Sequence, residues 1–97
     1  MGIELTEMNE WLWRSVVMKG IPVGRVVDVI LERENHGVIG FEVRCEDGRH
    51  RFLPRAAASS DGSAIQIDSA LALLDTDQLD FYRRRGLTLR STQEPAA

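Results

Sequence analysis

The stretch from Val23 to Phe52 constrains the fold more than any other part of the chain. It reads VGRVVDVILERENHGVIGFEVRCEDGRHRF and contains three strand-like patterns separated by two turn signals. The first pattern, Arg25 to Glu32, is rich in β-branched residues, and the second, Val38 to Cys45, alternates apolar and polar residues. Asn35-His36-Gly37 and Asp47-Gly48 are typical turn sequences because Asn, Asp and Gly tolerate positive φ. The stretch therefore predicts antiparallel strands joined by short turns.

Alternation along a strand assigns its side chains to two faces of the sheet. We place on the inner face a set of apolar residues that includes two from a later alternating segment: Val27, Val29, Leu31, Ile39, Phe41, Val43, Cys45, Ile65 and Ile67. An apolar strip of Val26, Ile30 and Val38 then falls on the outer face and needs cover. That cover is either a C-terminal helix or a second chain, and we favour the helix because it is already tethered.

Asp47-Gly48 is the favoured sequence for a two-residue hairpin turn. Folding the chain about it places Cys45 opposite His50, Arg44 opposite Arg51 and Val43 opposite Phe52. Phe52 is therefore also expected in the core. Gly24 and Gly40 interrupt strand patterns, which weakens a flat sheet but suits one that bends sharply or closes.

The chain resembles the PRC-barrel family in three segments: Val23 to Ile30, Gly37 to Val43, and Arg51 to Pro54. The resemblance covers roughly Val16 to Leu74. It implies an all-β fold, a small antiparallel barrel of about six strands. Such barrels occur alone, in the H subunit of the photosynthetic reaction centre and at the end of a ribosome maturation factor. In those settings the barrel is a docking module, and the family has no common catalytic residues.

The flanking segments complete a single domain. We expect residues 1–10 to be flexible, residues 11–75 to form the barrel, residues 76–90 to form a helix with an extended tail, and residues 91–97 to be disordered. Leu71 to Leu74 is the expected last strand. The helix prediction rests on Asp75 or Thr76 as a cap, on arginines near the C-terminal end and on Gly86 as the stop. A helix this short needs burial of Leu79 and Tyr82 on the barrel to be stable.

Composition limits the expected cellular location and the class of partner. Twelve basic and 15 acidic residues are interspersed and give a net charge of −3, so nucleic acid is a less favoured partner than protein. Cys45 is the single cysteine, which excludes an internal disulfide. The chain shows no signal-peptide pattern and no membrane-length apolar run, so we expect a cytoplasmic protein without membrane insertion.

Catalytic and metal-binding patterns are weak in this sequence. Cys45 opposite His50 is the nearest approach to a nucleophile and base, but no orienting third group is evident. Cys45, His36 and His50 do not have the spacing of a metal site. We therefore expect no catalytic residues, no metal, no cofactor and no small-molecule substrate.

Two kinds of surface residue are candidates for binding a partner. A basic patch on the outer face of the hairpin comprises Arg44, Arg49, Arg51 and Arg55. The apolar candidates are the outer strip and two tryptophans, Trp11 and Trp13, which share one face of a strand and either plug the barrel end or form an exposed patch.

These features favour a non-enzymatic protein-binding or scaffold module, with another protein or a second copy of the chain as partner. One alternative is a ribosome- or RNA-associated assembly factor. A third and different interpretation is a thiol enzyme that uses Cys45 and His50.

Overall fold

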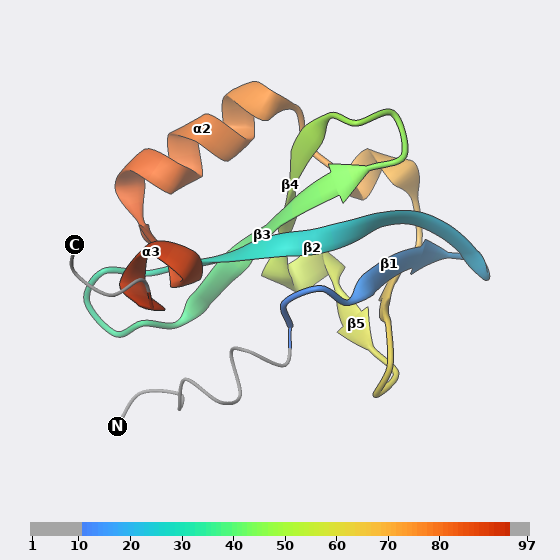
Figure 1. Ribbon diagram of the computed structural model, residues 1–97, viewed down its shortest axis with the longest axis horizontal. Coiled ribbons are helices and arrows are strands. Elements are labelled where there is room, and N and C mark those ends of the chain that lie inside the picture. The colour runs from blue at the N-terminus through green and yellow to red at the C-terminus, as the bar shows by residue number, and fades with distance from the viewer. Residues whose placement is uncertain (1–10, 94–97) are drawn as a thin grey trace.

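A curled sheet with a short C-terminal helix forms the structure, a computed structural model that describes residues 11–93 (Figure 1). Six strands follow one another across the sheet in the order β4-β3-β2-β1-β6-β5. Their bounds are β1 Ser15–Met18, β2 Ile21–Leu31, β3 Val38–Cys45, β4 His50–Pro54, β5 Ser59–Ser60 and β6 Ile65–Ile67. Between residues 11 and 93 no ladder joins β4 to β5, so the sheet is a half-barrel. Residues 1–10, expected to be flexible, and residues 94–97 of the expected disordered tail 91–97 lie outside the described residues, whereas residues 91–93 are helical.

Short helices and one further strand complete the fold. The 3-10 helices are η1 (Arg55–Ala57) and η2 (Ala70–Ala72), the α-helices are α2 (Thr76–Arg85) and α3 (Leu89–Gln93), and the extra strand is β7 (Leu87–Thr88). Leu71 to Leu74, expected as a last strand, is instead η2 followed by a single bridge between Leu74 and Phe52. Among the helices in the described part of the chain, none is long and apolar enough to cross a membrane.

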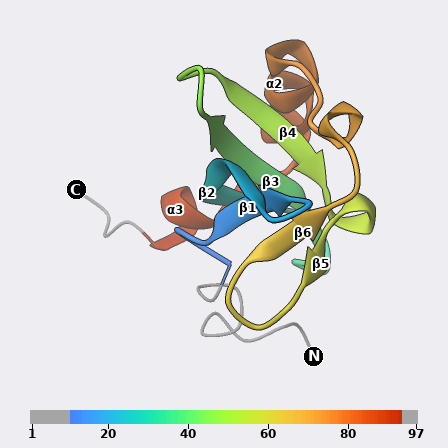
Figure 2. The ribbon, with the colours of Figure 1, turned by 90° about the vertical axis from the view of Figure 1, so that its right-hand side faces the viewer.

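The long strand β2 organises the sheet. β3 pairs along one edge of it, whereas the other edge is shared between β1 at its N-terminal half and β7 at its C-terminal end. The turn from β1 to β2 is Lys19-Gly20, and positive φ at both residues gives a tight hairpin. β1 also pairs in parallel with β6, which carries the sheet around the curl (Figure 2).

Two β-bulges change the face assignment that simple alternation predicts. Val27 is an extra residue in β2, because Val26 pairs with Val43 whereas Asp28 pairs with Glu42. Val26 is consequently fully buried in the main core, and Val27 is half-buried on the outer side. Our placement of these two valines was therefore wrong.

The second bulge acts in the same way on β3. Ile30 pairs with Gly40 and Leu31 with Val38, which leaves Ile39 as the extra residue. Val38 packs on the main core and Ile39 on the outer side, the reverse of the prediction. The expected outer strip thus reduces to Ile30.

The turn between β3 and β4 has three residues rather than two. Cys45 N donates to Arg49 O at 2.8 Å, Gly48 N donates to Cys45 O at 2.9 Å, and Gly48 has φ of 81°. This is a type I turn followed by a glycine bulge, a common three-residue hairpin connection. It shifts the register by one residue, so that Arg44 pairs with His50, Val43 with Arg51 and Glu42 with Phe52. The pairings that we predicted from a two-residue turn were wrong.

Apolar side chains are buried on both faces of the sheet. The concave side holds the main core, in which the expected Val29, Leu31, Phe41, Val43, Cys45, Ile65 and Ile67 are confirmed. The convex side carries a second cluster of Ile30, Phe52 and Leu79, which α2 covers with Tyr82 packed at its edge. The expectation that Leu79 and Tyr82 hold the helix on the sheet is confirmed. Phe52 is buried as expected, but under α2 rather than inside the curl.

Candidate functional site

The hairpin arginines do not form the single basic patch that the sequence predicts. Arg44 lies on the convex face with Glu42 and His50, whereas Arg51 pairs with Val43 and so belongs to the other face. Arg49 is exposed near the turn, and the Arg55 guanidinium lies 4.9 Å from the ring centroid of Trp11. The one-residue register shift separates these side chains.

Arg51 is held within its own hairpin. Its Nη1 and Nη2 atoms donate to Asp47 Oδ1 and Oδ2 at 3.1 and 2.9 Å, a bidentate ion pair. Hydrogen bonds from the Arg51 guanidinium and from the Arg49 N–H lower the pKa of Asp47 to about 2. Asp47, and to a smaller degree Cys45, raise the pKa of Arg51. Arg51 is therefore a structural clamp and is less available to a partner than Arg44.

The two tryptophans have different environments and do not share a strand face. Trp13 has φ of 67° and lies in a turn, which breaks the strand that we predicted there. Trp11 is half-buried, with its ring centroid 4.9 Å from that of Phe41, so it closes one side of the core. Trp13 is 52% exposed, and the Arg90 guanidinium lies 5.5 Å from its ring centroid.

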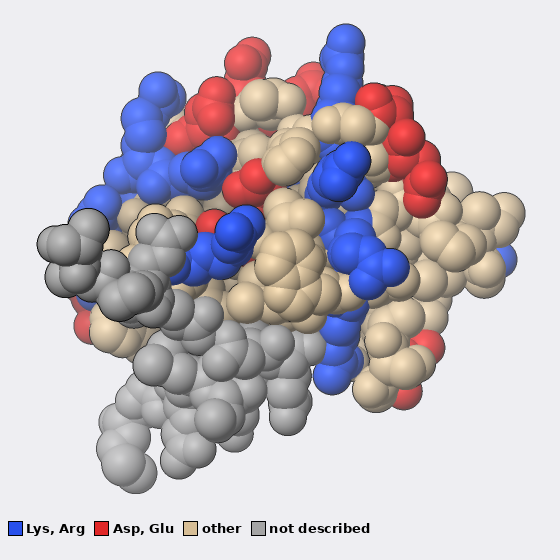
Figure 3. Space-filling model, viewed as in Figure 1, with Lys and Arg blue, Asp and Glu red and all other residues tan. Residues whose placement is uncertain are grey.

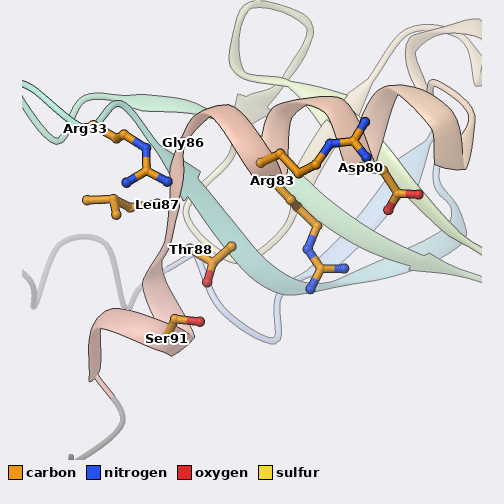
Figure 4. Close-up of a pocket in the computed structure, with 8 residues that line it drawn as sticks. Arg33, Asp80, Arg83, Gly86, Leu87, Thr88 and Ser91 are labelled. Atoms are coloured by element: carbon orange, nitrogen blue, oxygen red, sulfur yellow. The ribbon is translucent and has the colours of Figure 1, made fainter.

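Two adjoining depressions lie between α2, β7 and α3, and we call them together the arginine groove. Their volumes are about 480 and about 530 Å³, and both are lined by Arg83, Thr88 and Ser91. Five arginines line the groove: Arg33, Arg44, Arg83, Arg84 and Arg90. Figure 4 shows how side chains of α2, of the segment that follows it and of α3 surround the first depression. On the face drawn in Figure 3, Lys and Arg residues run across the middle with Asp and Glu residues between them.

Buried acidic groups form the floor of the second depression. Asp28 and Glu42 are cross-strand partners, and each is only 7% exposed. A hydrogen bond joins Glu42 Oε2 to His50 Nδ1, and Arg83 Nη1 lies 3.7 Å from Glu42 Oε1. The His50 side chain is 43% exposed, so it can be reached from the groove. Carboxylates this deep need such partners because desolvation disfavours their charge.

Asp28 fastens the C-terminal segment to the sheet. Its Oδ1 accepts hydrogen bonds from Val29 N at 2.8 Å and from Arg90 N at 3.1 Å. The second bond fixes the start of α3 and so positions the Arg90 side chain over Trp13. Burial raises the pKa of Asp28, and the nearby Glu42 charge acts in the same direction.

Cys45 and His50 do not face each other as the sequence predicts. Cys45 is buried and pairs with Gly24, and its Sγ lies 3.9 Å from Val43 O. His50 pairs with Arg44 on the convex face and contacts Glu42. The described residues contain no group of three or more His, Cys, Asp or Glu side chains placed to hold a metal ion.

Much of the groove escaped the sequence analysis. The Arg83 to Arg85 run is interpreted from the sequence mainly as a feature of a helix C-terminus, with nucleic-acid contact as the less favoured alternative. No local signal places Arg90 near Asp28, because 62 positions separate them in the chain. The sequence shows Asp28 and Glu42 as polar residues within two strand patterns, but it does not show that they pair across the sheet.

The curled sheet with its short helix and arginine groove defines the chain as a small, mostly β protein with a basic depression on its convex side. No protein-family model matches the sequence. No curated protein matches it either.

Proposed function

We propose that this protein is a non-enzymatic binding module of the PRC-barrel type, and that the arginine groove is its partner-binding surface. The observation that carries the proposal is the convergence of arginines from separate parts of the chain on one groove. Arg33 follows β2, Arg44 lies on β3, Arg83 and Arg84 lie on α2, and Arg90 lies on α3. Like charges repel, so clustering these arginines costs free energy unless an anionic partner neutralises their charge.

The charge of the groove differs from that of the whole chain. The groove has five arginines against three acids, Asp28, Glu42 and Asp80, and two of those acids are buried. The chain carries a net charge of −3. Guanidinium groups bind carboxylates in a planar, bidentate geometry, which suits them to recognise acidic side chains of a protein.

Support for the PRC-type scaffold is the sequence resemblance together with the curled antiparallel core of β1 to β4. An RNA-associated factor remains the second candidate because Trp13 is exposed beside the arginines, and stacking on an aromatic ring is one way to bind single-stranded RNA.

Capture from lysate with the tagged full chain tests the proposal. We compare the unmodified protein with a groove variant, Arg44→Gln with Arg84→Gln, since both residues are exposed and neither side chain bonds to another described residue. The matched control, Lys19→Gln with Arg49→Gln, removes the same charge at exposed turn positions away from the groove. Loss of a captured protein from the groove variant alone supports the proposal. Identical capture by all three chains contradicts it.

A further inference from the structure

The arginine groove is an elongated surface with a mixed chemistry. Its two depressions share Arg83, Thr88 and Ser91, so one extended ligand can occupy both. Arginines line both parts, whereas the buried carboxylates lie in the floor of only the second. A ligand must therefore present anionic groups to the arginines of the rim. It must also avoid repulsion from the carboxylates of Asp28 and Glu42, or donate hydrogen bonds to them.

We propose that this occupant is an acidic peptide segment of a partner protein, and that Glu42 and Asp28 make the groove select polypeptide over nucleic acid. The inference rests on the proposed function and names the chemistry of its ligand. A peptide has both parts that the groove requires, because its Asp and Glu side chains pair with arginines while its backbone N–H groups donate to carboxylates.

The rim has arginines that are ready for a ligand. Arg44 and Arg84 bond to no other described side chain. The Arg83 guanidinium forms an ion pair with Glu42 at 3.7 Å, which is longer than a hydrogen bond, so a ligand carboxylate would compete with Glu42 for it. Because Glu42 Oε2 is taken by His50, its Oε1 is the acceptor that faces Arg83. An incoming N–H group that donates to Oε1 would leave Arg83 to bind the carboxylate of the ligand.

The floor disfavours nucleic acid for an electrostatic reason. A nucleic-acid backbone carries a charge at each nucleotide and would pass over Glu42 and Asp28 in the second depression. Repulsion by a charged carboxylate is weakly screened there, because both acids are buried and buried charges are screened less than surface charges. Stacking offers little compensation, since Arg90 already lies over Trp13 and the other exposed ring of the lining, His50, is bonded to Glu42.

Fluorescence anisotropy with defined probes tests the ligand chemistry. The probes are a fluorescein-labelled peptide of alternating Glu and Gly, the same peptide with Gln for Glu, and a single-stranded RNA of equal length. For the full chain we expect the Glu peptide to bind about tenfold or more tightly than either other probe, a difference of about 1.4 kcal/mol. The groove variant should lose about tenfold in affinity for the Glu peptide, and the control variant should stay within about twofold.

A floor substitution separates selectivity from simple attraction of charge. Glu42→Gln keeps the shape of the side chain and removes its charge, so RNA affinity should rise about threefold or more while Glu-peptide affinity does not rise in parallel. Equal gains for both probes would overturn the role of the floor. Circular dichroism of each variant establishes that it is folded.

Other results overturn the inference in distinguishable ways. RNA bound more tightly than the Glu peptide, with dependence on the groove arginines, would identify an RNA-binding groove. A sedimenting mass that changes in the groove variant alone would identify a second copy of the chain as the occupant. If the Glu peptide does not bind but capture from lysate still depends on the groove arginines, the acidic-peptide hypothesis is refuted and the proposed function stands. Loss of both would refute the proposed function as well.

Discussion

Replacing Phe52 and Tyr82 with leucine, singly and together, tests the register of the β3–β4 hairpin. The three-residue turn places Phe52 on the convex face, where its ring centroid lies 4.4 Å from that of Tyr82 with 15° between the planes. A two-residue turn would instead direct Phe52 into the curl beside Val43. The two registers therefore give Phe52 different partners, and a double-mutant cycle can tell them apart.

The expected magnitudes follow from burial and ring geometry. Phe52 is 1% exposed and Tyr82 is half-buried, so each single substitution should cost about 1–3 kcal/mol. A domain of this size has a total stability of about 5–15 kcal/mol, so the variants should remain folded. A stacked aromatic pair contributes about 0.5–1.5 kcal/mol beyond its buried area. The double variant should therefore lose less stability than the sum of the single variants, by about that amount.

Urea denaturation followed by far-UV circular dichroism supplies the four unfolding free energies of the cycle. A second cycle between Phe52→Leu and Val43→Ala is the control, because the structure places these side chains on opposite faces of the sheet. That cycle should be additive within about 0.5 kcal/mol. Additivity between Phe52 and Tyr82 together with coupling between Phe52 and Val43 would refute the register and restore the two-residue turn.

Three further predictions follow from single residues. Gly40→Ala should cost about 1–3 kcal/mol in urea melts, because the added Cβ would lie 2.5 Å from both Leu53 O and the Phe52 ring; a neutral effect would contradict this packing. Burial raises the pKa of Asp28 in the folded protein above its ordinary value of 3.8. Protonation of Asp28 therefore stabilises the fold fully below pH 3.8, and this stabilisation is lost as pH rises through the folded-state pKa. The unmodified protein should thus gain stability relative to Asp28→Asn as pH falls from about 7 to about 4, and a constant difference would exclude the effect. Cys45, only 8% exposed, should react slowly with a thiol reagent in the folded protein and rapidly in urea; fast native labelling would show that the thiol is accessible.

The sequence alone was sufficient for the positions of the main elements. Alternation and β-branched residues identified β2 and β3, and the turn residues Asn35-His36-Gly37 lie where the chain reverses. Asp75 and Gly86 stand at the two ends of α2, although the Asp75 side chain makes no capping hydrogen bond. These signals are local, because a cap or a turn depends on the backbone preferences of a few neighbouring residues.

Only the tertiary structure decided which face each side chain occupies and which residues meet. Val27 and Ile39 are bulge residues, and the glycine bulge at Gly48 shifts the next strand by one position. Since side chains alternate with a period of two, each single extra residue transfers the following residues to the opposite face. The pattern could not reveal this, because α2 covers the convex face and allows apolar residues there as well as in the curl. The contact of Arg90 with Asp28 likewise depends on β7 pairing with β2, a long-range choice that no local sequence preference specifies.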